Sequence, residues 1–284
     1  MNAASEPAPP AAALALVPGL ESGAAPLRLE RLSGGSVNDS WRVDTSQGRF
    51  VLRMDGPAAQ RPGVERARER RIHELVAHAG LAPLALVWAA APGVQVREYI
   101  EGRVWQEHDM LRPDQLQRLG ARLAQLHAIE PPGEVALFDP GACAQQYLRQ
   151  MATAAAQTAN ECGSADARAG ANAAAAAVRA AAARVAGHSA APVIVHGDLT
   201  HANLLDGRQL WLLDWEYAQC AEPIYDVACV LAYYPAALPQ APQLLAAAGL
   251  AGADAPARLA DAILVYEGLT RLWHLARGTG AHAD

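Results

Sequence analysis

Two aspartates and an asparagine stand beside three short apolar runs in and around the stretch VHGDLTHANLLDGRQLWLLDWEYA. Asp198 follows the apolar run PVIV, Asn203 directly precedes a second apolar run, and Asp214 follows a third. The Asp206–Gly207 pair between the last two runs predicts a tight hairpin turn. Because a hairpin returns the chain to its starting end, we expect Asn203 and Asp214 to lie close together, with Asp198 in the loop that leads into the hairpin.

Carboxylate and amide oxygens at one end of a hairpin suit Mg²⁺, which is usually held by one or two carboxylates together with phosphate oxygens and water. They do not suit zinc, and the four cysteines are scattered without a C-x-x-C pair. An H-x-D triplet, an Asn five residues later and an Asp after a hairpin follow the order of the catalytic and metal-binding loops of kinases. Asp and Asn are also common in ordinary hairpins, but the ordered pattern as a whole favours phosphoryl transfer.

The segments HGDLTHANLL and LLDWEYA resemble the aminoglycoside phosphotransferase and choline kinase superfamily, and the resemblance covers roughly residues 27 to 275. The form D-W-E-Y, with Glu216 two residues after Asp214, is most similar to the choline, ethanolamine and thiamine kinases in that superfamily. Glu216 is therefore expected to lie near the metal or the substrate.

This resemblance implies an ATP-dependent phosphotransferase that acts on an alcohol. It implies that Asp198 orients the acceptor hydroxyl and accepts its proton, and that Asn203 and Asp214 hold Mg²⁺ against the ATP phosphates. His196 is expected to belong to the catalytic loop and to support it through hydrogen bonds. Asp226, in PIYDVA, matches an aspartate of the family that braces the same loop.

The same resemblance implies an α+β fold with the bilobal architecture of protein kinases. A small antiparallel β-sheet with one helix would form the N-terminal, nucleotide-covering lobe over residues 26–97. A larger, mainly helical lobe over residues 98–284 would carry the catalytic hairpin and bind the acceptor. Residues 1–25 contain a short apolar run that an acidic but no basic residue precedes, which is not typical of a signal peptide. We expect them to be a disordered or loosely attached leader.

The residue pattern predicts elements in the order that this fold requires. Apolar and polar residues alternate between about residues 27 and 54, which predicts three antiparallel strands, the last two joined by the turn TSQG. Residues 62–80 have helical periodicity, two more strands flank a turn at Pro92–Gly93, and residues 112–128 form an amphipathic helix. Residues 143–186 are alanine-rich, and we expect helices there, with a low-complexity insertion as the alternative.

Phosphoryl transfer depends on charge neutralisation and alignment, so the N-terminal lobe should supply a loop that covers the phosphates. The stretch LSGGSVNDSW is the candidate, because glycines allow backbone N–H groups to approach phosphates closely. Gly34, Gly35, Ser36 and Asn38 in this stretch are similar to the G-G-x-x-N loop of choline- and thiamine-kinase-like proteins. By itself, the glycine pair is equally consistent with an ordinary turn.

Arg53, in FVLRM, is the candidate cation for the phosphates. Most members of the superfamily have lysine there, so the arginine indicates either an inactive protein or the choline-kinase branch, where arginine is common. Arginine can bind phosphate in a bidentate manner. A carboxylate on the following helix should hold this cation. Glu69 matches the family best by its distance from the turn after the helix, with Glu65 and Glu74 as alternatives.

The segment REYIEG falls where the two lobes should join. The resemblance implies that backbone groups of Glu98, Tyr99 and Ile100 contact the adenine of ATP, although an ordinary strand end would have the same sequence character. His127 closes a helix with a pattern similar to the L-x-x-L-H of the family, and we expect it to be structural.

The acceptor is expected to be a small alcohol, of the choline, ethanolamine or thiamine type, bound by the C-terminal helices. An aromatic pocket would attract such a cation, although aromatic residues at helical spacing are also typical of a core. An aminoglycoside or a sugar is the alternative acceptor, and a nucleotide-binding pseudokinase is a second alternative to which only Arg53 points. The candidate pocket residues are Tyr225, Tyr233, Tyr234, Tyr266, Glu267 and Trp273.

The composition excludes several other kinds of partner. The chain has 284 residues with a net charge of −6 and no basic stripe, which argues against binding to nucleic acid. No apolar run reaches the roughly 18 residues that indicate a membrane-spanning helix. Scattered cysteines without a disulfide pattern fit a reducing cytoplasm.

Overall fold

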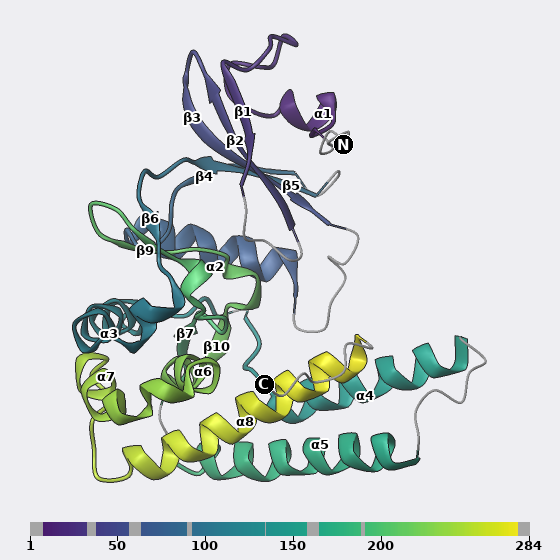
Figure 1. The fold of residues 1–284 in the computed structure, drawn as a ribbon, viewed down its shortest axis with the longest axis vertical. Coiled ribbons are helices and arrows are strands. Elements are labelled where there is room, and N and C mark those ends of the chain that lie inside the picture. Colours follow the sequence, from purple (N-terminus) through teal and green to yellow (C-terminus); the bar gives the residue numbers. More distant parts are fainter. Residues whose placement is uncertain are drawn as a thin grey trace.

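The computed structural model describes residues 8–32, 38–56, 64–89, 93–133, 135–157, 165–188 and 191–277. A β-rich lobe and a larger, mainly helical lobe lie one above the other in Figure 1. This arrangement confirms the predicted α+β fold. The expected N-terminal lobe boundary at residue 97 falls near the end of the last strand of the β-rich lobe, just before the chain enters the helical lobe.

Five antiparallel strands form the sheet of the small lobe, in the order β1-β2-β3-β5-β4. The turn between the second and third strands lies at the predicted TSQG. The register places Arg53 opposite Gln95 and Val51 opposite Arg97. Because side chains alternate along a strand, these four residues share one face of the sheet. The strands are β1 (Arg28–Arg31), β2 (Asn38–Thr45), β3 (Gly48–Asp55), β4 (Ala85–Ala89) and β5 (Val94–Glu98).

Helix α2 (Arg66–His78) packs against this face of the sheet. It is followed by Gly80, whose φ of +71° is a left-handed conformation that glycine adopts without strain. Ile72 and Val76 are fully buried, as the helical periodicity predicts. Glu69 is also buried, with only 1% of its surface exposed. A buried carboxylate requires a partner, and this helix therefore presents a charge to the interior of the lobe.

The opposite face of the sheet is covered by the segment that we expected to be a disordered or loosely attached leader. Helix α1 (Ala11–Leu14) and the turns after it bury Ala13, Val17 and Leu20 against the apolar side chains of the sheet, including Trp41 and Leu52. For the described part of residues 1–25, the expectation is therefore wrong. The physical reason is that a sheet with two apolar faces needs cover on both of them.

The helical lobe contains the predicted hairpin and the predicted amphipathic helix α3 (Pro113–His127), whose Leu116, Leu119, Leu123 and Leu126 are fully buried. The hairpin strands β8 (Leu204–Asp206) and β9 (Leu210–Leu212) pair in register. The other elements are β6 (Arg103–Val104), η1 (Glu107–Leu111), α4 (Pro140–Gln157), α5 (Ala165–Ala186), β7 (Val193–Val195), η2 (His201–Asn203), η3 (Trp215–Tyr217), β10 (Gln219–Ala221), α6 (Ile224–Tyr233), η4 (Pro235–Gln240), α7 (Ala241–Ala247) and α8 (Ala255–Ala276), where η denotes a 3₁₀-helix.

The alanine-rich stretch is helical, as expected, and it is not an unpacked insertion. Helices α4 and α5 lie alongside α8 (Figure 1). Ala171, Ala175, Val178 and Ala181 recur at helical spacing on one side of α5 and are buried. Small side chains permit close approach of the helix axes, so alanine serves here as the core residue.

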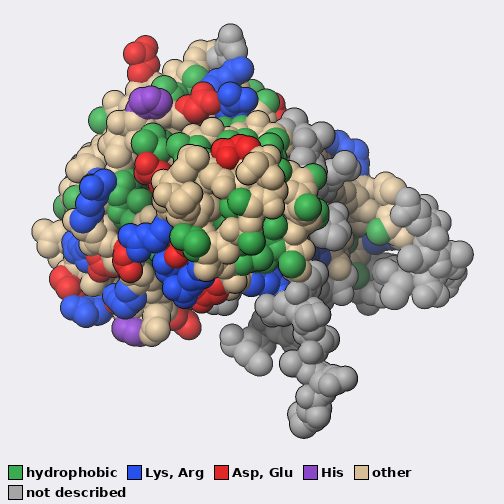
Figure 2. Space-filling view, turned by 90° about the horizontal axis from the view of Figure 1, so that it is seen from above, with side chains coloured by type: hydrophobic (Ala, Val, Ile, Leu, Met, Phe, Trp, Pro, Cys, Tyr) green, Lys and Arg blue, Asp and Glu red, His purple; other side chains and the backbone are tan. Residues whose placement is uncertain are grey.

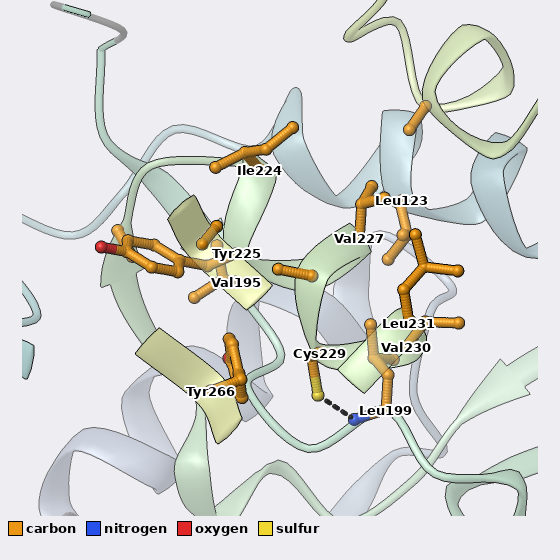
Figure 3. Packing of buried hydrophobic residues seen from close by; sticks show 14 of the residues in the cluster. Leu123, Val195, Leu199, Ile224, Tyr225, Val227, Cys229, Val230, Leu231 and Tyr266 are labelled. Carbon is orange, nitrogen blue, oxygen red and sulfur yellow. Dashed lines mark hydrogen bonds between the residues drawn. The ribbon is translucent and has the colours of Figure 1, made fainter. Parts of the chain in front are cut away.

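Helix α6 runs through the centre of the large core. Figure 3 shows Val227, Val230 and Leu231 of α6 packed near Leu123 and Leu199. The loop that carries Asp198 is thus anchored on a buried, mostly apolar helix. This packing fixes the position of the loop more firmly than its own few residues could.

Within the described residues, no helix is both long and apolar enough to cross a membrane. The face of the molecule in Figure 2 carries arginine and acidic side chains close to one another, with apolar side chains between them.

Candidate active site

The hairpin brings the three oxygen-bearing side chains together as the sequence predicts. The backbone N–H of Leu213 donates to the carbonyl of Asn203 (2.8 Å), which places Asp214 beside Asn203. The side-chain amide of Asn203 donates to the carboxylate of Asp198 (3.0 Å) and to the Asp198 carbonyl (2.8 Å). The catalytic role of Asp198 and the metal-binding roles of Asn203 and Asp214 remain predictions.

Asp214 has a strained backbone. Its φ of 59° and ψ of 73° are left-handed, and it is the one non-glycine residue with positive φ in the described part of the chain. Such a conformation costs of order 1–3 kcal/mol and persists where the surroundings enforce it. Here it turns the carboxylate toward the N-terminal lobe, where the guanidinium of Arg53 lies 3.2 Å away.

Asp198 lies in an environment that disfavours its charged form. Burial and the nearby carboxylate of Asp214 raise the pKa of Asp198 to about 7. The hydroxyl of Tyr233 donates to its Oδ1 (3.3 Å), and Asn203 donates to its Oδ2. The carboxylate is therefore held in one orientation while it remains able to take up a proton near neutral pH.

His196 forms hydrogen bonds to the two segments that carry Asp198 and Asp214. Its side chain is fully buried, and burial lowers its pKa, so the ring is neutral. Nε2 lies 2.8 Å from the carbonyl of Leu213, and Nδ1 accepts from the N–H of Asp198 (3.3 Å). These contacts fix the tautomer with the proton on Nε2. His196 thus connects the loop of Asp198 to the strand end before Asp214, the position expected of a residue that supports the loop through hydrogen bonds.

Asp226 braces the same loop, as its match to the family implies. It is fully buried on α6 and accepts hydrogen bonds from the backbone N–H groups of His196 (3.0 Å) and Gly197 (3.1 Å). The ring of His127 lies 3.0 Å from its other oxygen, so this histidine has the structural position expected for it. Gly197 has a φ of +78°, and an added Cβ would lie 2.8 Å from the carbonyl of Tyr217, so glycine is required there.

Arg53 pairs with Glu69, the carboxylate favoured from the sequence, at 2.7 Å. Both side chains are buried, and a buried pair of this kind holds each charge in place. The two alternatives lie outward. The side chain of Glu65 is 66% exposed and that of Glu74 is 49% exposed, and each is paired with an arginine of the same helix.

Arg66 was not identified from the sequence, although it joins much of the site. Its guanidinium lies 2.6 Å from Glu69, 2.6 Å from Asp55 and 3.3 Å from Glu216. It also donates to the side-chain oxygen of Asn38 (3.3 Å). The available signal was its position three residues before Glu69, which places both on one side of the helix.

Glu216 lies where the two lobes meet. The amide of Asn38, from β2, donates to its carboxylate (3.0 Å), while burial and the carboxylate of Asp214 raise its pKa. Asn38 thus contacts Glu216 and Arg66 through its side chain. Gly34, Gly35 and Ser36, the rest of the expected phosphate-covering loop, lie outside the described residues.

The segment between the lobes offers fewer free backbone donors than expected. The N–H of Glu98 is bonded to the carbonyl of Leu84 (2.9 Å), and the N–H of Tyr99 is bonded to the carbonyl of Arg49 (3.0 Å). The N–H of Ile100 has no partner among the residues that the structure describes. Of the expected base-contacting N–H groups, the one at Ile100 is therefore available to a ligand.

Most of the aromatic residues proposed for the acceptor pocket are used elsewhere. Tyr225, Tyr234 and Tyr266 are buried in the core, and Figure 3 shows the first and last of them among its apolar side chains. Trp273 lies under Arg277, whose guanidinium is 4.5 Å from the ring centre. Tyr233 is 41% exposed and contacts Asp198. Tyr233 is thus the one of these aromatic residues that contacts Asp198, and Glu267 is exposed on α8.

A cavity of about 560 Å³ opens between α2 and the β4–β5 hairpin. Asp198 is not part of its lining, so an acceptor bound in this cavity would not reach the Asp198 carboxylate. The cavity adjoins the rear of the Arg53–Glu69 pair. The residues that line it are Arg53, Asp55, Arg66, Ala67, Arg70, Arg71, Glu74, Trp88, Ala89, Gly93, Val94 and Gln95.

The residues present fit a Mg²⁺ ion. The amide nitrogen of Asn203 is engaged with Asp198, which leaves its amide oxygen to a ligand, and the carboxylate of Asp214 lies beside it. These are the hard oxygen donors that Mg²⁺ prefers. In the described part of the chain, no group of three or more His, Cys, Asp or Glu side chains could hold a metal ion by itself. A bound metal would thus share its ligands with phosphate and water.

Comparisons with known proteins agree with this geometry. Residues 28–261 match the sequence profile described as the phosphotransferase enzyme family. No curated protein sequence matches the chain. Among solved structures, a choline/ethanolamine kinase family protein from Mesorhizobium loti is 27% identical with a TM-score of 0.70, over 96% of this chain and 87% of that one.

Two further structures are similar in fold. The choline kinase LicA from Streptococcus pneumoniae, in its complex with AMP, is 19% identical with a TM-score of 0.71, over 93% of this chain and 91% of that one. The GDP complex of a mutant aminoglycoside 2′-phosphotransferase IIIa is 16% identical with a TM-score of 0.62, over 91% of this chain and 87% of that one. With a family match over most of its length and a kinase-like arrangement of loop, hairpin and interlobe ion pair, the chain belongs to the phosphotransferase enzyme family.

Proposed function

We propose that this protein is a small-molecule kinase that transfers the γ-phosphoryl group of a purine nucleoside triphosphate, with ATP as the expected donor, to an alcohol hydroxyl. The observation that supports it most directly is the convergence of Asp198, Asn203 and Asp214, with Arg53 of the other lobe 3.2 Å from Asp214. A pseudokinase would not need a carboxylate at position 198 that is oriented by two side-chain donors.

In the proposed reaction, the acceptor hydroxyl oxygen bonds to the γ-phosphorus while the bond from that phosphorus to the bridging oxygen breaks. The hydroxyl proton passes to Asp198, and the products are a phosphate monoester and the nucleoside diphosphate. Because the pKa of Asp198 is about 7, the carboxylate can accept this proton and release it again near neutral pH. Tyr233 and Asn203 would keep its orientation during the transfer.

Asn203 and Asp214 would hold Mg²⁺, which when bound neutralises charge on the phosphates. Arg53 would bind the phosphates from the other lobe, with Glu69 fixing its direction. The N–H of Ile100 would bind the purine base. Gly34, Gly35 and Ser36 remain candidates for covering the phosphates by their position in the sequence.

For the acceptor, we propose a cationic alcohol of the choline, ethanolamine or thiamine type. Three carboxylates, those of Asp198, Asp214 and Glu216, lie close enough to influence one another. Tyr233 adds an aromatic ring beside them. The similarity to choline and ethanolamine kinases supports the same class. An aminoglycoside, which is also cationic, is the second candidate, because a kinase of that class shares the fold.

The remaining expectations concern the surroundings of the protein. We propose a cytoplasmic location, since Cys143, Cys220 and Cys229 are free thiols. We propose that the partner is the small-molecule acceptor and that neither nucleic acid nor a membrane is bound.

The proposal is tested by measuring nucleoside diphosphate release with choline, ethanolamine, thiamine, aminoglycosides and sugars as acceptors. We expect turnover with at least one cationic alcohol. In Asp198→Asn, which keeps the shape of the side chain but cannot accept the proton, we expect kcat to fall by about a thousandfold or more, while the Kd for the Mg²⁺ nucleotide stays within about threefold. Near-normal kcat in this variant would contradict the assignment, and tight nucleotide binding without turnover on any acceptor would favour the pseudokinase.

A further inference from the structure

Arg97 is a partly buried arginine of the small lobe whose role the family resemblance does not assign. It is the residue before the segment 98–100, and it lies opposite Val51 in the sheet register. Arg53 stands two residues further along the same strand as Val51, a separation of about 7 Å. Arg97 is therefore on the same face of the sheet as Arg53, but nearer to the segment proposed to bind the base.

The charges that act on Arg97 are those of Arg53, Asp214 and Glu69, so its guanidinium lies near the residues of the candidate active site. Burial and the positive charge of Arg53 lower its pKa to about 10, while Asp214 and Glu69 act in the opposite direction. Arg97 thus remains charged at neutral pH and lies partly buried inside the lobe.

Within the described part of the chain, Arg97 has no ion-pair or hydrogen-bond partner. Two other arginines of this group, by contrast, already have carboxylate partners. Arg53 contacts Glu69 and Asp214, and Arg66 contacts three carboxylates. A guanidinium carries five N–H donors and no acceptor, and leaving such donors unmatched on further burial costs free energy. The donors of Arg97 are therefore available to a ligand that brings acceptor atoms.

ATP and GTP, the two common phosphoryl donors, differ in the hydrogen-bonding groups that their purine bases present on one edge. Guanine presents two acceptors, O6 and N7, on one edge, and arginine binds them as a pair. Adenine presents N7 as an acceptor but an amino group, which is a donor, in place of O6. An adenine beside Arg97 would place its amino group, a hydrogen-bond donor, against the N–H groups of the guanidinium. A guanine would instead accept hydrogen bonds from two of these N–H groups.

We propose that Arg97 contacts the O6 and N7 edge of the donor base and makes GTP a phosphoryl donor at least as efficient as ATP. The proposal rests on the proposed function, because it names the donor of the same transfer. The N–H of Ile100 fits either base, since it can donate to N1 of adenine or to O6 of guanine. Arg97 is thus the residue that sets the preference.

The test compares GTP and ATP as phosphoryl donors in the wild-type protein and in Arg97→Met, which keeps an unbranched apolar stem but removes the guanidinium N–H donors. We expect kcat/KM with GTP to equal or exceed that with ATP in the wild type. In Arg97→Met, the ratio of kcat/KM with GTP to kcat/KM with ATP should fall about tenfold or more, because the value for GTP falls further than the value for ATP. Arg112→Met is the matched control, because Arg112 is an exposed arginine paired with Asp114 far from the cleft, and it should leave the ratio unchanged.

Calorimetric Kd values for GDP and ADP give a second readout that needs no acceptor. We expect the wild type to bind GDP at least as tightly as ADP, and Arg97→Met to lose that preference. A GDP affinity more than about tenfold weaker than the ADP affinity in the wild type overturns the proposal, and so does an unchanged donor ratio in Arg97→Met. This wild-type comparison decides the question even if the variant does not fold. The absence of transfer from either donor to any acceptor would instead contradict the proposed function.

Discussion

At the residue scale, Arg53 shows why an arginine can replace the expected lysine without loss of the site. All 23 basic Lys and Arg residues of the chain are arginines, so the substitution follows the composition of the protein and does not single out this position. A guanidinium has donors pointing in several directions. Arg53 uses them to contact Glu69 at 2.7 Å and Asp214 at 3.2 Å, on opposite lobes. We therefore interpret Arg53 as a feature of an active phosphotransferase.

His73 provides a prediction about pH at the same scale. It is buried on α2 with 3% of its surface exposed, and burial together with the charges of Arg97 and Arg53 lowers its pKa to about 3. The unfolded chain binds a proton at His73 below about pH 6.5, whereas the folded protein does not until about pH 3. The free energy of unfolding is therefore unaffected by this group above pH 6.5 and falls as the pH decreases from 6.5 toward 3.

In His73→Leu, the decrease of the unfolding free energy between pH 6 and pH 4.5 should become smaller by up to about 1.4 kcal/mol per pH unit. Urea titrations at several pH values measure this slope. His108→Leu is the control, since His108 has 66% of its side chain exposed. Equal slopes in His73→Leu and in the wild type would show that His73 takes up a proton in the folded state.

At the element scale, the close contact between α5 and α8 depends on glycine. A Cβ added to Gly268 of α8 would lie 2.4 Å from a methyl carbon of Val178 on α5, a separation that van der Waals repulsion forbids. Gly170, also within α5, has room, because its nearest neighbour would be a nitrogen of Arg271 at 3.5 Å. The two glycines thus differ in packing but not in secondary structure.

We predict opposite effects of alanine at these two positions. Gly268→Ala should lower the free energy of unfolding by about 1–3 kcal/mol, because the two helices must separate. Gly170→Ala should raise it by about 0.5–1 kcal/mol, because alanine favours the helix. Denaturant unfolding of both variants provides the comparison. A stabilised Gly268→Ala variant would mean that α5 and α8 are not in close contact.

At the scale of the whole molecule, polar side chains connect the two lobes across the cleft. Glu216 of the helical lobe contacts Asn38 and Arg66, and Asp214 contacts Arg53. The residues on the opposite side come from β2, β3 and α2. A nucleotide bound at these residues, as proposed, would therefore meet groups of both lobes, and its binding would depend on the relative position of the lobes.

The N-terminal segment that covers the outer face of the sheet also belongs to the scale of the whole molecule, and its packing leads to a stability prediction. Leu20 is 2% exposed and packs in the cluster that covers the outer face of the sheet. Leu20→Ala should cost about 2–4 kcal/mol of unfolding free energy. Leu27→Ala should change it by less than about 0.5 kcal/mol, since Leu27 is 78% exposed. Equal thermal midpoints for the two variants would indicate a loosely attached segment, as the sequence suggested.

Local patterns determined much of the fold and of the candidate site. The proximity of Asp198, Asn203 and Asp214 could be predicted from the sequence, because a tight hairpin turn brings the two ends of its strands together without long-range contacts. Helix α3 and the strands of the sheet followed from periodicity, which depends on the burial of one face. The choice of Glu69 as the partner of Arg53 came from the resemblance to the family, by the distance of Glu69 from the turn after the helix.

The tertiary structure decided which polar groups remain free and which are already paired. Arg66 and Arg97 are both arginines on charged segments, yet one contacts three carboxylates and the other has no partner among the described residues. Likewise, Tyr233 contacts Asp198 while its neighbour Tyr234 is buried in the core. Sequence position indicates the type of a side chain and its local direction, but its partners come from strands and helices distant in the chain. For that reason a short stretch of sequence was enough to indicate the proposed chemistry, whereas the partners of the polar side chains were decided by the packing of the two lobes.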